Sequence, residues 1–132
     1  RRWPARVMVV DTSALMAVLL GEPDAERCIA ALEGQTDVMI SAGTLAEAMI
    51  VAGRRNIGAE MDALVDGLGF EIVSVSGAGS AKVAEAYARW GKGVHAASLN
   101  FGDCFAYALA RELGRPLLFV GEDFSKTDIE AA

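Results

Sequence analysis

The sequence has little from which to build a disulfide framework or a zinc site. Its 132 residues include two cysteines and one histidine. Cys28 and Cys104 lack C-x-x-C spacing and are expected to be small buried residues in a reducing compartment. Structural zinc needs four ligands, mostly sulfur or nitrogen, so we expect none here. Any bound metal should be held by oxygen.

Long apolar runs are also missing. The longest, ALMAVLLG at residues 14–21, is much shorter than the roughly 20 residues of a membrane-spanning helix. The basic opening RRWPAR is not followed by the apolar segment and cleavage site of a signal peptide. We therefore expect a cytoplasmic protein in which residues 1–7 are an extension and residues 8–132 form a single domain.

Net positive charge is lacking as well. The chain has 12 basic and 18 acidic residues, a net charge of −6, which does not indicate a basic nucleic-acid-binding surface. An acidic chain can still act on RNA if its carboxylates surround a divalent cation, because the ion reverses the local charge. The alternative is that the negative charge serves solubility alone.

Motifs of other catalytic classes are absent. There is no Walker loop (GxxxxGK[ST]) and no GxGxxG, so a glycine-rich phosphate cradle is not supported. The single histidine, His95, lies far along the chain, which argues against a Ser-His-Asp triad.

What the sequence does contain is an alternation of strand and helix patterns. Apolar runs and period counting predict strands at residues 7–10, 37–41, 70–76 and 116–120. Helical spacing and glycine stops predict helices at residues 12–21, 22–34, 44–56, 58–69, 79–93 and 103–114, with Pro23 at an allowed position in the first turn of the second helix. Strands separated by helices imply crossover connections, so the expected fold is a three-layer α/β domain with a mostly parallel sheet.

Acidic residues gather where ligands bind in such sheets, outside the carboxyl ends of the strands. Asp11 follows the first strand, Glu47 lies early in the helix after the second, and Asp103 starts the helix before the last strand. Asp123 comes three residues after the last strand. Like charges at one edge repel and raise one another's pKa unless a cation neutralises them. This pattern indicates a Mg²⁺ or Mn²⁺ site able to support hydrolysis of a phosphodiester.

Each acid also has a simpler interpretation. Asp11 and Asp103 could cap their own helices, and Asp123 could belong to a turn. TLAE at residues 44–47 fits a capping box in which Thr44 is the cap and Glu47 reaches back to it. Taken singly, capping explains each residue, whereas the convergence of all the acids at one edge favours the metal site.

Several stretches together resemble a known family. VVDTSALMAVLLGEPDAE, ISAGTLAEA, LNFGDCFAYALA and LLFVGEDFSKTDI are similar to the PIN-domain ribonucleases, specifically the VapC-type toxins of bacterial toxin–antitoxin pairs. The resemblance covers residues 8 to about 130. It implies a three-layer α/β/α PIN-like fold and a Mg²⁺- or Mn²⁺-dependent endoribonuclease. It also implies a bacterial protein that cuts RNA, transfer RNA being the family-level expectation, forms a homodimer and is neutralised by a cognate antitoxin.

The resemblance also assigns site residues. Asp11, Glu47, Asp103 and Asp123 match the family's acidic quartet, which would be both catalytic and metal-binding. Ser13 matches a supporting hydroxyl, and Thr12 and Asp128 are a possible second hydroxyl and an auxiliary acid. Around Asp123 the family often has GND where this chain has GED, so that Glu122 adds a carboxylate.

Five basic side chains and one stripe of apolar residues can each be interpreted in a functional or in a purely structural way. Side chains that could contact RNA are Arg54, Arg55, Lys92, His95 and Lys126; they could equally be ordinary surface residues, and His95 could simply be hydrogen-bonded within its loop. The stripe of Met16, Leu19, Leu20, Ile29 and Leu32 is expected in the core. Part of it could instead be the groove in which an antitoxin helix lies.

Two rival functions remain. A receiver-type phosphoacceptor would need an aspartate after a middle strand, but ISAG and SVSG end those strands without one. A PIN-like binding module that has lost catalysis is the second rival. The first three acids argue against such a module, and the Glu122 substitution keeps it open.

Overall fold

A computed structural model describes residues 7–34 and 37–132. Within this part of the chain the strands are β1 (Val7–Val10), β2 (Asp37–Ser41), β3 (Glu71–Val73) and β4 (Leu117–Leu118). They form a sheet of order β3-β2-β1-β4, and every pairing between neighbours is parallel. The predicted α/β class with a parallel sheet is confirmed.

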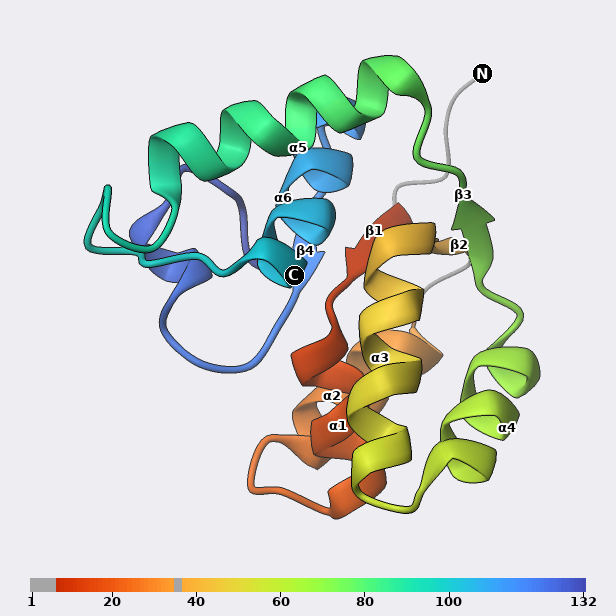
Figure 1. Cartoon of the computed structure of the whole chain (residues 1–132). Helices are drawn as coiled ribbons and strands as arrows, with labels where there is room; N and C mark the ends of the chain where they lie inside the picture. The colour runs from red at the N-terminus through yellow and green to blue at the C-terminus, as the bar shows by residue number, and fades with distance from the viewer. Residues whose placement is uncertain (1–6, 35–36) are drawn as a thin grey trace.

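Helices connect and cover these strands on both faces. They are α1 (Thr12–Leu20), α2 (Ala25–Glu33), α3 (Ala42–Arg54), α4 (Gly58–Leu68), α5 (Gly77–Trp90), α6 (Phe101–Leu113) and the short 3₁₀ helix η1 (Phe124–Lys126). Figure 1 shows α5 and α6 on one side of the sheet and α1 to α4 on the other. The structure therefore has three layers.

The central strand shows why two cores form. Successive side chains of a strand point to opposite faces. Met8 and Val10 pack with α1 to α4, whereas Val9 packs with α5 and α6. All residues of β1 are buried, as expected for a parallel strand covered on both faces. The sequence expectation excluded residue 7 from the domain, but Val7 is the first residue of β1 and pairs with Asp37.

Several helix starts differ from the predicted ones. The capping-box prediction for Thr44 and Glu47 is wrong, because α3 begins at Ala42 and the Ser41 hydroxyl accepts the cap bond from Gly43 N at 3.2 Å. Helix α2 begins after Asp24, so Pro23 precedes the helix instead of lying in its first turn.

The third strand is shorter than predicted. β3 ends at Val73, because it is an edge strand paired only with β2 and because Ser76 already caps α5. The Ser76 hydroxyl accepts from Gly79 N at 3.0 Å. Of the predicted apolar stripe, Met16 and Leu32 are buried and Leu19 and Leu20 pack against the core. Ile29 departs from the prediction, with 38% of its surface exposed.

The strand order determines where a ligand would bind. The chain adds β2 and β3 on one side of β1 and then returns to place β4 on the other side. Ligands of open parallel sheets bind at such a switch point, outside the carboxyl ends of the two diverging strands. Here that point lies between β1 and β4, where Asp11 N donates to Leu118 O at 3.0 Å.

Candidate active site

Asp11 is the buried centre of the acidic cluster. It is 3% exposed and is the N-cap of α1. Its Oδ2 accepts from Ser13 N at 3.0 Å and from Ser13 Oγ at 2.6 Å. Its Oδ1 is buried and has no hydrogen-bond partner among the described residues. Capping therefore uses one oxygen of Asp11 and leaves the other free for a cation.

Ser13 joins two segments of the site. While its hydroxyl donates to Asp11, it accepts from Val120 N at 3.0 Å. Val120 follows β4 and lies three residues before Asp123. Ser13 thus holds the turn after β1 against the segment after β4.

Glu47 reaches the cluster from the second turn of α3. Its Oε1 accepts a hydrogen bond of 2.8 Å from the buried Thr12 hydroxyl. Its carboxylate also lies against the start of α6, so closely that a Cβ added at Gly102 would overlap it. Gly102 does not have a positive φ, so the backbone would accept another residue there, but the Glu47 carboxylate would have to move to make room for a Cβ.

Asp103 is fixed by a reciprocal capping box at the start of α6. Asn100 Oδ1 accepts from Asp103 N at 2.8 Å, and Asp103 Oδ2 accepts from Asn100 N at 3.0 Å. Asn100, rather than Asp103, is the N-cap residue. The pattern N-x-x-D in LNFGD is a known start signal and could have identified this cap from the sequence.

Asp103 feels the negative charge of the three other predicted acids. Burial raises the pKa of Asp11 to about 6, and the negative charge of Glu47 adds to the effect. Burial also raises the pKa of Asp103 to about 7, opposed by the hydrogen bond from Asn100; the charges of Asp11, Glu47 and Asp123 raise that pKa further. Asp123 itself is exposed, and its side chain does not cap η1.

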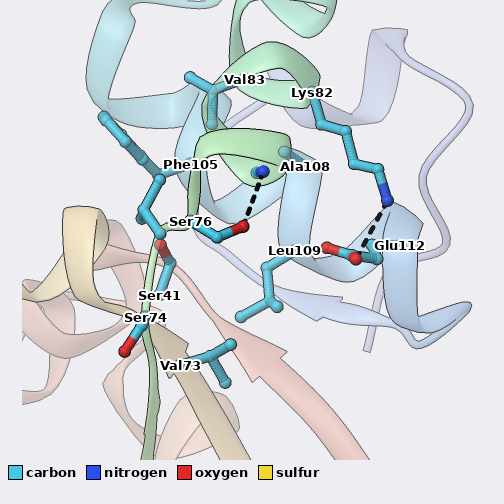
Figure 2. A pocket seen from close by; sticks show the side chains of 12 residues that line it. Ser41, Val73, Ser74, Ser76, Lys82, Val83, Phe105, Ala108, Leu109 and Glu112 are labelled. Carbon is cyan, nitrogen blue, oxygen red and sulfur yellow. Dashed lines mark hydrogen bonds and ion pairs between the residues drawn. The ribbon is translucent and has the colours of Figure 1, made fainter.

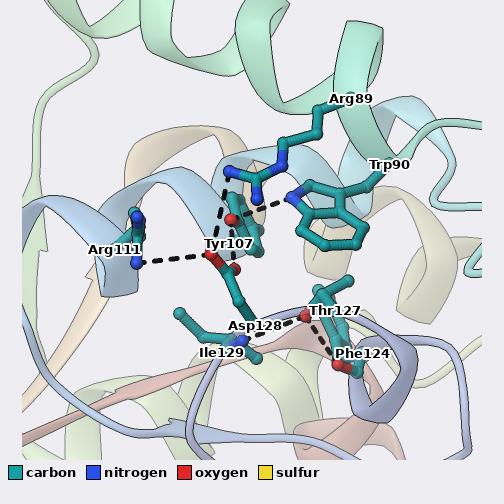
Figure 3. A network of polar contacts seen from close by, with 8 residues as sticks. All are labelled: Arg89, Trp90, Tyr107, Arg111, Phe124, Thr127, Asp128 and Ile129. Atoms are coloured by element: carbon teal, nitrogen blue, oxygen red, sulfur yellow. Dashed lines mark hydrogen bonds and ion pairs between the residues drawn. The ribbon is translucent and has the colours of Figure 1, made fainter.

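Asp128 belongs to a different network, shown in Figure 3. Its Oδ1 accepts from Tyr107 OH at 2.5 Å, and its Oδ2 lies 3.3 Å from Arg111 and 3.8 Å from Arg89. The Tyr107 hydroxyl in turn accepts from Trp90 Nε1 at 2.9 Å. The contacts of Asp128 are to donors and cations, and the structure does not bring it together with the other predicted acids.

The acidic cluster fits a hard divalent cation in its chemistry. As the side chains stand, no three Asp, Glu, His or Cys residues in the described part of the chain are grouped closely enough to hold a metal ion. Mg²⁺ does not require such a group, since it binds one or two carboxylates and keeps several waters. The partnerless Oδ1 of Asp11 is what such an ion would satisfy, because burial raises the pKa of this carboxyl and the pKa of the nearby Asp103 is raised by burial and then by the negative charges around it.

The predicted RNA-contacting cations lie on three separate segments of the chain. Arg54 and Arg55 are exposed at the end of α3, Lys92 lies in the loop after α5, and Lys126 ends η1. Within residues 7–34 and 37–132 none of them forms an ion pair. His95 is hydrogen-bonded within its loop, its Nδ1 accepting from Ala97 N at 2.9 Å, as the simpler interpretation predicts.

Pockets near the sheet edge differ in character. The one in Figure 2, about 140 Å³, lies between the ends of β2 and β3 and the helices α5 and α6. Lys82 and Glu112, which form an ion pair of 3.0 Å, are among the residues that line it, and no predicted site residue lines it. Two apolar pockets around Phe101 and Phe105 were missed by the sequence interpretation, and Glu47 lines one of them.

Comparison with known proteins shows the family to which the chain belongs. The model of the PIN domain matches residues 8–130. Ribonuclease VapC30 of Mycobacterium tuberculosis is 45% identical over 125 residues, covering 92% of this chain and 95% of that protein. The chain belongs to the VapC family of PIN-domain proteins. A ribonuclease VapC of Mycolicibacterium smegmatis is 42% identical over 127 residues, covering 94% of this chain and 98% of the relative.

Solved structures of other VapC and toxin proteins share the fold of this VapC-family chain. VapC20 of Mycobacterium tuberculosis, described as a sarcin-ricin loop cleaving toxin, aligns with a TM-score of 0.76 at 20% identity, covering 95% of this chain and 98% of that one. A toxin–antitoxin complex from Klebsiella pneumoniae aligns with a TM-score of 0.69 at 18% identity, covering 92% of each chain. In the described part of this chain, no helix is both long and apolar enough to cross a membrane.

Proposed function

We propose that this chain is a metal-dependent endoribonuclease that hydrolyses phosphodiester bonds of RNA. The observation that carries the proposal is the buried Asp11 carboxylate, whose Oδ1 has no partner in the described structure and whose neighbours are acids. Asp11 and Asp103 would be the main ligands of Mg²⁺ or Mn²⁺, and Glu47 and Asp123 would complete the site directly or through water.

The bound cation would activate water for attack and stabilise charge on the phosphate. The chain's own residues prepare the site for it. Ser13 orients Asp11, the capping box with Asn100 orients Asp103, and Thr12 holds Glu47. Asp128 has a structural role instead: its carboxylate accepts a hydrogen bond from Tyr107 and pairs with Arg111, and these contacts hold the C-terminal segment against α6.

The relatives support a place in a toxin–antitoxin pair. Two relatives at 45% and 42% identity are named ribonuclease VapC30 and ribonuclease VapC, and a solved structure with the same fold is a toxin–antitoxin complex. We therefore propose a bacterial, cytoplasmic toxin that forms a homodimer and is neutralised by a cognate antitoxin. Its RNA target is proposed to be structured RNA of the transfer RNA class.

The test is cleavage of total RNA by purified, antitoxin-free protein with Mg²⁺, with Mn²⁺ and with EDTA. Asp11→Asn is the test variant, and Asp62→Asn, an exposed acid on α4, is the matched control. Discrete fragments that depend on metal, persist in the control and vanish in Asp11→Asn support the proposal. Identical fragments from wild type and Asp11→Asn would show contamination.

A binding module without catalysis gives a different result. It would cut no RNA under any of the three conditions and would bind no Mn²⁺. Equilibrium dialysis measures Mn²⁺ binding and so separates this outcome from an enzyme with a narrow substrate range. Such an enzyme would bind the ion, and its activity would have to be sought with a wider set of RNAs.

A further inference from the structure

An exposed aromatic ring lies directly beside the acidic cluster. We propose that Phe101 stacks on an unpaired base of the RNA next to the scissile bond. This inference rests on the proposed ribonuclease function and adds a residue that positions the substrate. It commits to a nucleobase as the occupant of the apolar surface around Phe101.

The exposure of Phe101 calls for an explanation. It is 69% exposed, more than any other large hydrophobic residue of the described chain, and it precedes Gly102 and Asp103. As the first residue of α6, its backbone is fixed by the capping box between Asn100 and Asp103. Because the backbone of Phe101 is already ordered, only the two side-chain torsions of the ring remain to be fixed when a ligand stacks on it, which lowers the entropic cost of binding.

The ring is also supported from behind. Phe101 and Phe105 meet edge to face, with centroids 4.9 Å apart and planes inclined by 79°. Phe105 lies so close to α3 that a Cβ added at Gly43 would overlap its ring. The aromatic pair is therefore braced against the helix that carries Glu47, and one ring of the pair is left facing solvent.

Pockets lie on both sides of the pair. One, of about 290 Å³, is bounded by Glu47, Ile50, Gly102 and the two rings. The other, of about 390 Å³, is bounded by the same rings with Val83 and Tyr87. Both volumes are at the small end of the range for small-ligand sites, which suits one flat ring system in each.

Glu47 and Phe101 line the same pocket, and this favours a nucleobase over another apolar group as its occupant. Single-stranded RNA is recognised by stacking splayed bases on aromatic side chains, and stacking tolerates any base because each has a π face. A nucleotide whose base lies against Phe101 has its phosphate near the carboxylates.

Along the same face of α3, Glu47, Ile50 and Arg54 follow at helical spacing, with Arg54 about 10 Å beyond Glu47 along the axis. Within the described residues Arg54 has no ion pair, so it is available for the next phosphate.

The test measures kcat and KM for a short single-stranded RNA that contains the site mapped for the wild type. Phe101→Ala and Phe101→Leu remove the π face, and Phe101→Tyr keeps it. Ile72→Ala is the control, since Ile72 is 51% exposed and lines neither pocket. We expect KM to rise about tenfold in the Ala and Leu variants, with kcat changed much less, and to stay near wild type in the Tyr variant.

A second substrate series distinguishes stacking from a structural role. Each nucleotide flanking the cut is replaced in turn by an abasic one. For the wild type, one abasic position should raise KM about tenfold; for Phe101→Ala, the same replacement should add nothing, because the stacking partner is already gone. Unfolding curves of all variants confirm that the fold is kept.

Three results would overturn the inference. One is an unchanged KM in Phe101→Ala while the wild type cleaves RNA, which leaves the ribonuclease proposal intact. Another is an abasic effect equal in wild type and variant. The third is a mass in solution, measured by light scattering, that is lower for Phe101→Ala than for the wild type. This result would show that the surface around Phe101 forms a contact between protein chains. A wild type that cuts no RNA refutes the proposed function, and this inference with it.

Discussion

Two networks of this protein are centred on an aspartate, and they use it in opposite ways. Asp128 has both oxygens engaged by Tyr107, Arg111 and Arg89 (Figure 3). Asp11 is more deeply buried, has one partnerless oxygen, and its charged neighbours are acids. A carboxylate surrounded by donors stabilises the fold, whereas one surrounded by like charge costs stability and needs a cation. The difference separates a structural acid from a functional one better than residue type does.

The largest expected contrast is between Asp11→Asn and Asp128→Asn. We expect Asp11→Asn to lower RNA cleavage by more than about 100-fold, since even outer-shell partners of metal sites cost about 10- to 100-fold. Asp128→Asn should leave cleavage within about threefold and reduce the free energy of unfolding by roughly 1–3 kcal/mol, because donors from Tyr107 and Arg111 lose their charged acceptor. Cleavage rates and urea unfolding of both variants check this, and equal losses of activity would remove the distinction.

The pH dependence of the free energy of unfolding should show directly how much the buried, ionised Asp11 carboxylate destabilises the folded state. In metal-free protein the pKa of Asp11 is raised from 3.8 to about 6, so between these values the folded state binds more protons than the unfolded state. Stability therefore falls as pH rises from about 4 to about 7, by an amount on the order of 2–3 kcal/mol for this group. Asp11→Asn removes that fall, and should be more stable than wild type at pH 8 in EDTA but not at pH 4.

Metal provides the control for this titration. At pH 8, Mn²⁺ should raise the free energy of unfolding of the wild type, because it binds the folded state alone. It should have little effect on Asp11→Asn. A wild type whose stability in EDTA increases between pH 4 and pH 7 more than that of Asp11→Asn would show that Asp11 is not destabilised by its surroundings.

Gly102 tests how closely the site is packed. A Cβ at this position overlaps the Glu47 carboxylate, so Gly102→Ala should displace Glu47 and reduce cleavage by about 10-fold or more. Gly67→Ala is the matched control: it also lies in a helix, but a Cβ there meets nothing within 4 Å. The control should keep full activity and gain about 0.5–1 kcal/mol of stability. Equal activity of both variants would mean that Glu47 can move without consequence.

The sequence predicts the fold better than it predicts the contacts within the candidate site. Periodicity suffices for the strand β1 and for α4, whose local pattern agrees with their burial. It fails where a tertiary partner decides, as at β3, which has one neighbour only. The acids could be placed at one edge by topology alone. That Glu47 is held by Thr12 rather than by Thr44 depends on a contact across 35 residues, which no local pattern contains.

The two threonines beside Glu47 give the smallest and most selective test. Thr12 donates to Glu47 at 2.8 Å, whereas the Thr44 hydroxyl is buried without a partner in the described structure. Thr12→Val keeps shape but removes the donor, so cleavage should fall by about three- to tenfold, roughly the 0.5–1.5 kcal/mol of one hydrogen bond. Thr44→Val removes a hydroxyl that gains nothing from its position, and should leave activity unchanged while stability stays equal or rises by up to about 1 kcal/mol. The two hydroxyls differ in their contact with Glu47, and the Thr12 hydroxyl also lies 3.3 Å from Thr44 O, to which it donates more weakly. Equal rates for the two variants would therefore show that the carboxylate is positioned by its packing against Gly102 alone.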